Sequence, residues 1–305
     1  MKVTVIILTY NEELHIDRCI RSAQLITDSI CVVDSNSSDR TVDIASSLGA
    51  QVLSRKFDSH SRQFNWALTM IDPCDWVIRM DADEYLSEGL VNAINGVVES
   101  NCAAISGYAF SRRIVFLGKL IRFGGVFPVE IVRMFRYQCG KAEQRLMDEQ
   151  IVVSGKVVAL KSEIIDDNKN SLSWWIDKHN RYSSLEALET FSSGEANEAR
   201  SELSGKTALR RKMKNAYYKL PISIRAVLLF IYRYLIRQGF RDGFYGFLFH
   251  FYQGLWYRLL VDSKHQTLVD AGIVSVSNSS VDLISHLLGL PPELIELKLD
   301  SKRNR

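Results

Sequence analysis

The sequence lacks a long hydrophobic segment. In its 305 residues no run of about 20 apolar residues is free of charge, so no transmembrane helix is predicted. The apolar run Val3–Leu8 is too short for the hydrophobic region of a signal peptide, and two acids, Glu12 and Glu13, follow it closely. We therefore expect a cytoplasmic protein without a cleaved leader.

Cysteine is also scarce. The chain has five cysteines, an odd number, and none of them forms a Cys-x-x-Cys motif. This pattern excludes the disulfide framework of a small secreted domain. We expect all five to be reduced core residues of a cytosolic protein: Cys19, Cys31, Cys74, Cys102 and Cys139.

The chain as a whole has little excess charge, with a formal net charge of +3 at pH 7. Internal repeats and long low-complexity segments are absent. Hydrophobic residues make up 47% of the sequence, which is ample for a globular core. Length and composition together predict one large domain or two.

Short apolar runs alternate with amphipathic segments in the first part of the chain. Strands are predicted at Val3–Leu8, Ile30–Val33, Gln51–Ser54 and Trp76–Met80. Helices are predicted around Leu14–Leu25, at Thr41–Leu48 with Gly49 as the stop, and at Ser61–Met70. Continuous β-branched runs are typical of strands buried on both faces of a parallel sheet. The alternation therefore predicts a right-handed, doubly wound α/β unit.

The fourth predicted strand ends in three acids, Asp81, Asp83 and Glu84. The two-residue period of a strand would put Asp81 and Asp83 on one face, where two carboxylates repel unless a cation or a proton lies between them. Mg²⁺ is typically held by one or two carboxylates plus substrate phosphates. The cluster therefore predicts a Mg²⁺ or Mn²⁺ site. The alternative is a solvated turn whose aspartate caps the following helix.

Two other polar clusters favour the metal site. Thr9–Glu12 and Asp34–Asp39 each follow a predicted strand, as the acidic cluster does. Ligands of doubly wound sheets bind beyond the carboxyl ends of the strands. We therefore expect the three clusters to form one binding site.

The motifs in these clusters resemble family 2 glycosyltransferases of the GT-A fold. The motifs are Thr-Tyr-Asn-Glu at 9–12, Val-Asp-Ser-Asn-Ser-Ser-Asp-Arg-Thr at 33–41 and Met-Asp-Ala-Asp-Glu at 80–84. The resemblance covers about residues 1–160. Later blocks are similar to the bacterial subgroup that includes lipopolysaccharide-core β-1,4-glucosyltransferases: Phe127-Pro128, Arg133–Arg136, Asp148-Glu149 and Lys178–Ala187.

The resemblance implies a GT-A domain, a Rossmann-like mixed sheet, over residues 1–165 and a helical region over residues 166–305. It implies a nucleotide-sugar donor held by Thr9, Tyr10, Glu12, Asp34, Asn65 and Asp81, and a metal ion held by Asp83 with Asp81. Tyr10 is suited to stacking on a base, and Asp34 to accepting a hydrogen bond from a uracil N–H. A UDP-sugar is the donor that these two residues favour. For residues 34–39 the alternative is helix capping alone.

The sequence departs from the family pattern at two places. Ser35 and Asn36 replace the second Asp and the Gly of the common Val-Asp-Asp-Gly-Ser motif, which leaves the base preference open. Gln63-Phe64-Asn65 stands where relatives usually have Gln-Arg-Asn, so a cation is missing near the donor. Arg62 is a candidate to replace it.

Similar proteins have their catalytic base in a short acidic motif, here Asp148-Glu149. An inverting transfer needs one carboxylate to take the proton of the acceptor hydroxyl as its oxygen attacks the anomeric carbon. We place Glu149 first as this base and Asp148 second; a surface acidic pair is the alternative.

Three further residues have open roles. Arg133 and Arg136 pair with phosphates in one reading and are strand-edge charges in the other. His179 is either a ligand of the metal or the diphosphate, or a packed residue of a helix predicted at Trp174–Leu188.

After this helix, a turn is expected at Gly239–Gly243, a polar linker beyond Lys264 and an amphipathic helix at Val281–Leu288. Before it, Ile151–Val158 is predicted to be a hairpin or a strand.

The last third of the chain has the clearest charge asymmetry. Ten cations and no acid occur between Lys206 and Arg241, interleaved with aromatic and aliphatic residues up to Trp256. A basic, aromatic-rich and apolar helical stretch is typical of docking on an anionic membrane. No recognition motif for nucleic acid accompanies it. The alternative is a core helix pair with a few snorkelling arginines.

Together these features predict an inverting glycosyltransferase. It would move a hexose from a nucleotide-diphosphate sugar to a lipid-linked glycan at the inner face of a bacterial membrane, in lipopolysaccharide, O-antigen or other cell-surface polysaccharide synthesis. Two other classes are consistent with parts of the pattern. A nucleotidyltransferase would use the same acidic metal site and release pyrophosphate, and a non-catalytic glycan-binding protein would show no turnover.

Overall fold

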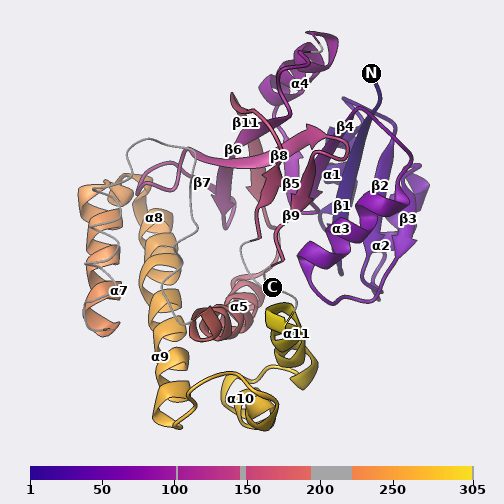
Figure 1. The fold of residues 1–305 in the computed structure, drawn as a ribbon. Helices are drawn as coiled ribbons and strands as arrows, with labels where there is room; N and C mark the ends of the chain where they lie inside the picture. The colour runs from indigo at the N-terminus through magenta and orange to yellow at the C-terminus, as the bar shows by residue number, and fades with distance from the viewer. Residues whose placement is uncertain (101, 145–148, 194–221, 304–305) are drawn as a thin grey trace. The chain divides into compact units, whose positions relative to one another are not determined.

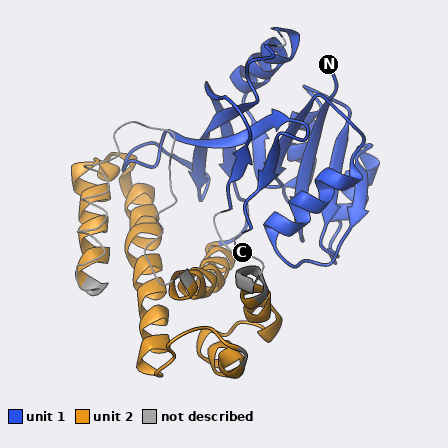
Figure 2. Cartoon of the chain, in the orientation of Figure 1, with its two compact units in different colours: residues 1–171 blue, residues 172–305 orange. Residues whose placement is uncertain are grey.

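The computed structural model describes residues 1–100, 102–144, 149–193 and 222–303. The chain divides into two compact units, Met1–Ser171 and Leu172–Arg305 (Figure 2). The first unit contains a mixed sheet with helices, and the second contains helices and their connections, with no strand among its described residues.

The first half of the large sheet is parallel and has the strand order β3-β2-β1-β4 (Figure 1). These strands are β1 (Val3–Thr9), β2 (Ile30–Asp34), β3 (Gln51–Ser54) and β4 (Trp76–Asp81). The connecting helices are α1 (Ile16–Ala23), α2 (Thr41–Ser47) and α3 (His60–Met70). All four strands and three helices predicted from the sequence are confirmed, with ends shifted by a few residues.

Strand β1 is buried along its whole length because a helix covers each face of the sheet. Val5 and Ile7 belong to the core cluster that includes Ile16 and Ile20 of α1. The alternate residues of β1 belong to a second cluster, with Phe64 and Ala67 of α3. This two-sided burial explains why β1 has a continuous apolar run rather than an alternating pattern.

The other half of the sheet is mixed. Strand β8 (Val129–Arg136) runs antiparallel to β4 and to β6 (Gly107–Phe116), and β11 (Val157–Asp167) runs parallel to β6. Two short strands, β5 (Glu84–Leu86) and β7 (Lys119–Ile121), pair with β11 and β6. Helix α4 spans Glu88–Ser100. The predicted architecture, a mixed α/β sheet followed by a helical region, is confirmed.

Of the hairpin or strand predicted at Ile151–Val158, strands are present at both ends of the range, but they do not pair with each other as a hairpin. Strand β10 (Ile151–Val153) pairs with β9 (Gly140–Ala142) in a separate two-stranded sheet, whereas β11 belongs to the large sheet. Gly155, with φ of 117°, separates the two strands. This left-handed region is open to glycine at little cost, so the chain changes sheets there.

The second unit is built on a long helix, α5 (Leu172–Ser193), packed against α9 (Tyr257–Asp270). Its other α-helices are α7 (Ile222–Ile231), α8 (Gly243–Phe249), α10 (Val281–Leu288) and α11 (Pro292–Arg303). Two π-helical segments, η1 (Tyr232–Ile236) and η3 (His250–Trp256), and two 3₁₀ turns, η2 (Gly239–Asp242) and η4 (Asn278–Ser280), connect them.

The prediction for α10 is confirmed and η2 lies at the predicted turn, but the linker before α10 begins at Ala271, after the end of α9, rather than directly beyond Lys264. Helix α9 continues through Lys264, whose ammonium group donates hydrogen bonds of 2.7–2.8 Å to Asn180, Ser183 and Ser184 of α5. These polar residues form a contact between two helices, although their composition alone indicates a loop.

Two further observations bear on the sequence predictions. Within the described residues, no helix is long and apolar enough to cross a membrane. All five cysteines are free thiols, but only Cys19 and Cys31 are buried. The prediction that all are core residues is wrong for Cys102, which is exposed, because it lies in the connection between α4 and β6.

Candidate active site

The polar clusters that follow β1, β2 and β4 meet at one edge of the sheet. Thr9 lies opposite Asp34, and Leu8 lies opposite Asp81, in the registers of the parallel strands. Thr9 Oγ1 donates a 2.9 Å hydrogen bond to Asp34 Oδ1. The strand ends thus bring together residues that are far apart in sequence, as expected for a ligand site in such a sheet.

Asp34 organises the loop that follows β2. Its carboxylate is buried and accepts hydrogen bonds from the backbone N–H of Ser37 at 2.8 Å and from Ser37 Oγ at 2.5 Å. Asn36 has φ of 61°, the left-handed region, which Asn tolerates better than most residues. This conformation accounts for Asn at a position where the family pattern has Gly. Ser35, the other departure, accepts a 2.7 Å hydrogen bond from buried Gln63.

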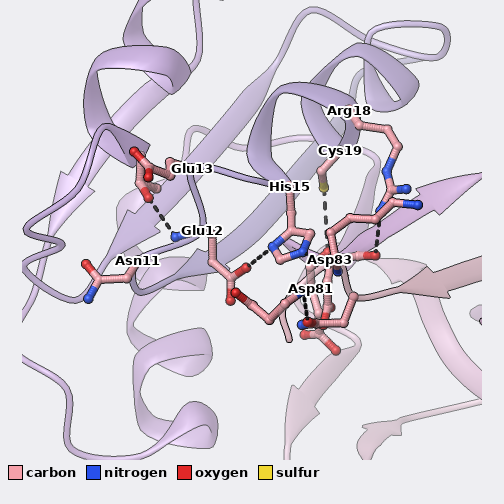
Figure 3. A network of polar contacts seen from close by, with 12 residues as sticks. Asn11, Glu12, Glu13, His15, Arg18, Cys19, Asp81 and Asp83 are labelled. Carbon is pink, nitrogen blue, oxygen red and sulfur yellow. Dashed lines mark hydrogen bonds and ion pairs between the residues drawn. The ribbon is translucent and has the colours of Figure 1, made fainter. Parts of the chain in front are cut away.

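Tyr10 and Glu12 lie in the loop after β1 and differ in their surroundings. The Tyr10 side chain is 60% exposed and free to stack on a ring. Glu12 Oε2 lies 2.6 Å from Nδ1 of His15, which is buried (Figure 3). Nε2 of His15 accepts a 2.8 Å hydrogen bond from the backbone N–H of Lys169, so Nδ1 carries the proton and donates to Glu12. His15 was not predicted as a site residue, because its only signal in the sequence is its position three residues after Glu12.

The acidic cluster is not a continuation of β4. The strand ends at Asp81, residues 82–83 form a turn, and β5 begins at Glu84. The prediction that Asp81 and Asp83 are alternate residues of one strand is therefore wrong. Asp83 Oδ2 instead accepts a 2.9 Å hydrogen bond from Asn168.

Arg133 of β8 joins two of these acids. Its Nη2 donates to Asp81 Oδ2 at 2.7 Å and to buried Glu84 Oε1 at 2.5 Å, while Glu84 Oε2 accepts from the backbone N–H of Asp81 at 3.0 Å. Burial, opposed by Arg133 and assisted by the Asp81 charge, raises the pKa of Glu84 to about 8. Burial acts on Asp81 in the same direction, but Arg133 and Arg79 outweigh it and hold the pKa of Asp81 well below its usual value. Arg133 thus favours an ionised Asp81, whereas burial and the neighbouring Asp81 charge favour a protonated Glu84.

Arg79 connects the acidic cluster to the predicted base. Its Nη2 lies 2.6 Å from Glu149 Oε1 and 3.6 Å from Asp81 Oδ1. The two carboxylate oxygens therefore lie no more than about 6.2 Å apart, the sum of these two distances. Arg79 and Glu149 have side chains only 6% and 8% exposed, so the pair is a buried ion pair. The sequence signal for Arg79 was a charge inside an otherwise apolar strand.

The two predicted arginines have different positions. Arg133 lies in the acidic cluster, but Arg136 lies opposite Trp76, at the other end of β4 from Asp81. Arg136 donates to the carbonyls of Ile105 and Cys102 at 2.9 and 3.0 Å and lies over the Trp76 ring. The phosphate role is therefore wrong for Arg136, which packs at the opposite edge of the sheet.

Asn65 and His179 are both engaged in contacts within their own units. The Asn65 amide donates to the carbonyl of Ala142 at 2.9 Å and accepts from its N–H at 2.8 Å, fixing β9 against α3. In the second unit, His179 donates from Nδ1 to the Trp175 carbonyl at 2.9 Å and stacks on the Trp175 ring. Burial lowers the pKa of His179 to about 4. These contacts favour the packed role for His179. Asp148, the second candidate for the base, lies outside the described residues.

The residues present suit a divalent cation that takes part of its coordination from phosphates. The described residues contain no group of three or more His, Cys, Asp or Glu side chains arranged to hold a metal alone. Asp81 is engaged by two arginines, whereas Asp83 uses Oδ2 for Asn168 and has no hydrogen bond at Oδ1 among the described residues. One available carboxylate with a second beside it matches the way Mg²⁺ binds with substrate phosphates.

Comparisons with known proteins show which family this domain is similar to. Residues 4–147 match the model of glycosyl transferase family 2. An uncharacterized glycosyltransferase of Rickettsia prowazekii is 27% identical over 259 residues, 81% of each chain, and one of Rickettsia typhi is 41% identical over 100 residues, 33% of this chain and 34% of the relative.

Among solved structures, glucosyl-3-phosphoglycerate synthase from Mycobacterium tuberculosis, in complex with Mn²⁺, UDP and glucosyl-3-phosphoglycerate, aligns at 22% identity with a TM-score of 0.31. The alignment covers 37% of this chain and 44% of that one, so this chain matches less than half of the solved protein's length. Residues 4–147, just under half of the chain, thus resemble glycosyl transferase family 2, and the Thr9–Glu12, Asp34 and Asp81–Glu84 clusters at one edge of the sheet lie within this matched region.

Proposed function

We propose that this protein is an inverting hexosyltransferase that uses a nucleotide-diphosphate sugar, a UDP-sugar by the chemistry of Tyr10 and Asp34. The observation that carries the proposal is the Arg79 bridge. It holds the carboxylates of Glu149 and Asp81 within about 6.2 Å of each other, the sum of its 2.6 and 3.6 Å contacts. A candidate base beside a donor-site acid is the arrangement that displacement of a nucleoside diphosphate by a sugar hydroxyl requires.

In the proposed reaction Glu149 acts as the general base. The acceptor oxygen forms a bond to the anomeric carbon, the bond to the diphosphate breaks, and the diphosphate leaves with the electron pair. Glu149 Oε2 takes the acceptor proton, since Oε1 is held by Arg79 and Oε2 has no hydrogen bond among the described residues. Because the base acts on the face opposite the leaving group, the configuration of the anomeric carbon inverts. Inverting glycosidases place their base in the same way.

Thr9, Tyr10, Glu12 and Asp34 form the nucleotide side of the proposed site, and Asp83 Oδ1, with Asp81 beside it, would hold Mg²⁺ or Mn²⁺. When bound, the cation supplies positive charge to the leaving diphosphate. Asn65 supports this side through β9, to which its amide is bonded. Asp148 stays a second candidate for the base.

The acceptor in this proposal is a lipid-linked glycan of bacterial cell-surface polysaccharide or lipopolysaccharide, held at the cytoplasmic face of the membrane. The second unit supports it with an apolar surface on α7, η1, η2 and α8, here called the apolar patch. Its exposed residues are Ile224, Val227, Leu228, Ile231, Tyr232, Leu235, Ile236, Phe240, Phe244 and Phe247. Arg237 and Arg241 lie exposed in the same stretch, where Asp242 is the one acid between residues 222 and 256.

The structure changes which residues would contact the lipid. Arg225 forms a bidentate ion pair with Asp262 of α9 and is not free to bind headgroups. Trp256 and Tyr252 pack with Trp175 inside the helical unit. Part of the predicted Lys206–Trp256 docking segment thus packs inside the helical unit, and residues 206–221 lie outside the described residues. In this proposal the apolar patch is the part of the segment that binds the membrane.

Flotation with liposomes tests the docking. We expect binding to anionic vesicles that weakens with salt without vanishing, because each Lys or Arg near such a surface contributes about 1 kcal/mol while apolar insertion is insensitive to salt. Phe244→Ser should reduce binding, and Val274→Ser, at a site 96% exposed outside the patch, should not. A wild-type chain that stays in solution at low salt would refute the docking.

A screen of nucleotide sugars with Mn²⁺ tests the activity itself. We expect slow hydrolysis of the true donor by the wild type and by Glu130→Gln, a control acid exposed on β8. Glu149→Gln should bind the donor normally and lose about 10²–10⁴ in transfer rate. Release of pyrophosphate would identify a nucleotidyltransferase, and the absence of any turnover would favour a glycan-binding protein.

A further inference from the structure

The chain that leaves β11 touches both sides of the proposed site. Residues Asp167–Asn170, here called the exit segment, begin at the last residue of β11 and continue beyond this strand. No motif in the sequence indicated that this polar run belongs to the site. Its backbone begins with a hydrogen bond of 3.0 Å from the Asp167 N–H to the Asp83 carbonyl, so it runs beside the acidic turn.

Asn168 holds the Asp83 carboxylate. Its Nδ2 donates to Asp83 Oδ2 at 2.9 Å, and its own Oδ1 accepts from the backbone N–H of Asn170 at 3.0 Å. The second bond determines the orientation of the amide, because only the oxygen can accept from an N–H. The amide nitrogen is therefore directed at Asp83, and it leaves Asp83 Oδ1 available.

The next residue holds Glu12. The backbone N–H of Lys169 donates to His15 Nε2 at 2.8 Å, and His15 Nδ1 donates to Glu12 Oε2 at 2.6 Å. His15 is 1% exposed, so water does not compete for either nitrogen. The peptide N–H selects the imidazole tautomer, and this tautomer turns a proton toward Glu12.

The exit segment is itself fixed by Arg18 of α1. Arg18 donates from Nη1 to Asp167 Oδ2 at 2.5 Å and from Nη2 to the Asp167 carbonyl at 2.7 Å, and its guanidinium lies over the Tyr85 ring at 4.4 Å. Asp167 is 4% exposed. A buried, bidentate anchor of this kind restrains the position of the residues that follow it.

We propose that the exit segment sets the geometry of the proposed donor site, with Asn168 and His15 as positioning residues for Asp83 and Glu12. This inference rests on the proposed function, which assigns Asp83 to the metal and Glu12 to the nucleotide. Asn168 and Lys169 share one peptide unit, so the metal side and the nucleotide side are held from adjacent residues. Partners that orient a metal-binding carboxylate typically change metal affinity about 10–100-fold when removed.

Two variants separate the two contacts. Asn168→Ala removes the donor to Asp83, and His15→Gln removes the imidazole between Lys169 and Glu12. Asn170→Ala is the matched control, because it removes a similar side chain from the same segment and keeps the backbone N–H that Asn168 uses. Calorimetric titration of UDP with and without Mn²⁺ is the measurement, and thermal unfolding of each variant reports folding.

Asn168→Ala should lower the apparent Mn²⁺ affinity in the presence of UDP about 10–100-fold and leave the metal-free affinity for UDP near that of the wild type. His15→Gln should weaken metal-free UDP binding, and Asn170→Ala should change neither. If the wild type binds UDP with Mn²⁺ and Asn168→Ala binds both equally well, the inference is refuted while the proposed function stands. If the wild type shows no Mn²⁺-dependent binding of UDP, GDP or ADP, the metal-dependent donor site is refuted, and the inference with it.

Discussion

Arg79 offers a test of the site that does not depend on the substrate. Arg79→Met removes one partner of a buried ion pair and leaves Glu149, 8% exposed, without its counter-charge. Removing one partner of such a pair typically costs about 3–5 kcal/mol, because the other charge stays buried and uncompensated. Arg79 also lies 5.4 Å from the centre of the Phe64 ring, a cation–π contact that the variant loses.

Glu149→Gln should cost less. Gln keeps an oxygen that accepts from Arg79, and Arg79 keeps Asp81 at 3.6 Å. The change replaces a charge-assisted hydrogen bond by a neutral one, which costs about 1–2 kcal/mol. In the double variant no buried charge remains at residue 149, so we expect it to be more stable than the sum of the single variants predicts, by about 2 kcal/mol.

The assay is urea denaturation with pulse-labelling hydrogen exchange, read on peptides from β1 and β4. These buried, adjacent strands report on the opening of the first unit. The reasoning is refuted if Arg79→Met costs less than about 1 kcal/mol, or if the two single costs simply add, because either result would show that the Arg79–Glu149 pair is not buried as a unit.

Three other changes test the packing around the site and in the helical unit. Asn65→Ala should lower the free energy of unfolding by about 1–3 kcal/mol. It should also speed amide exchange at Ala142, because the Asn65 side chain bonds both the N–H and the carbonyl of Ala142. Gly140→Ala should cost about 1–3 kcal/mol in urea denaturation, since its Cβ would lie 2.4 Å from the Phe135 ring, whereas Gly96→Ala, in open space on α4, should gain about 0.5–1 kcal/mol. The His179 imidazole has a pKa of about 4 in the folded chain against an ordinary value of 6.5, so it binds its proton more readily when unfolded. Thermal unfolding should therefore show a loss of at most about 3 kcal/mol as the pH falls from about 6.5 to about 4, absent in His179→Gln.

Local patterns were sufficient for the elements and for the place where polar residues gather. Val3–Leu8 could be recognised as a buried strand because a parallel strand covered on both faces needs an unbroken apolar run. The ends of such strands lie at one edge, so the sequence also indicated that Thr9, Asp34 and Asp81 would be neighbours. The sequence predicted the end of α9 several residues too early, at Lys264, because polar residues that join two helices have the same composition as a linker.

Only the tertiary structure decided how the charges are paired. Arg79 and Glu149 are 70 residues apart, and Arg133 reaches Asp81 across 52 residues, because β8 turns back antiparallel to β4. The same fold carried Arg136 to the opposite edge and brought Lys169 to His15. The residues next to a charged side chain in the sequence do not indicate which residue it will pair with. The pairing depends on strand register and on burial, which raises the cost of any charge left alone, and both exist only once the chain has folded.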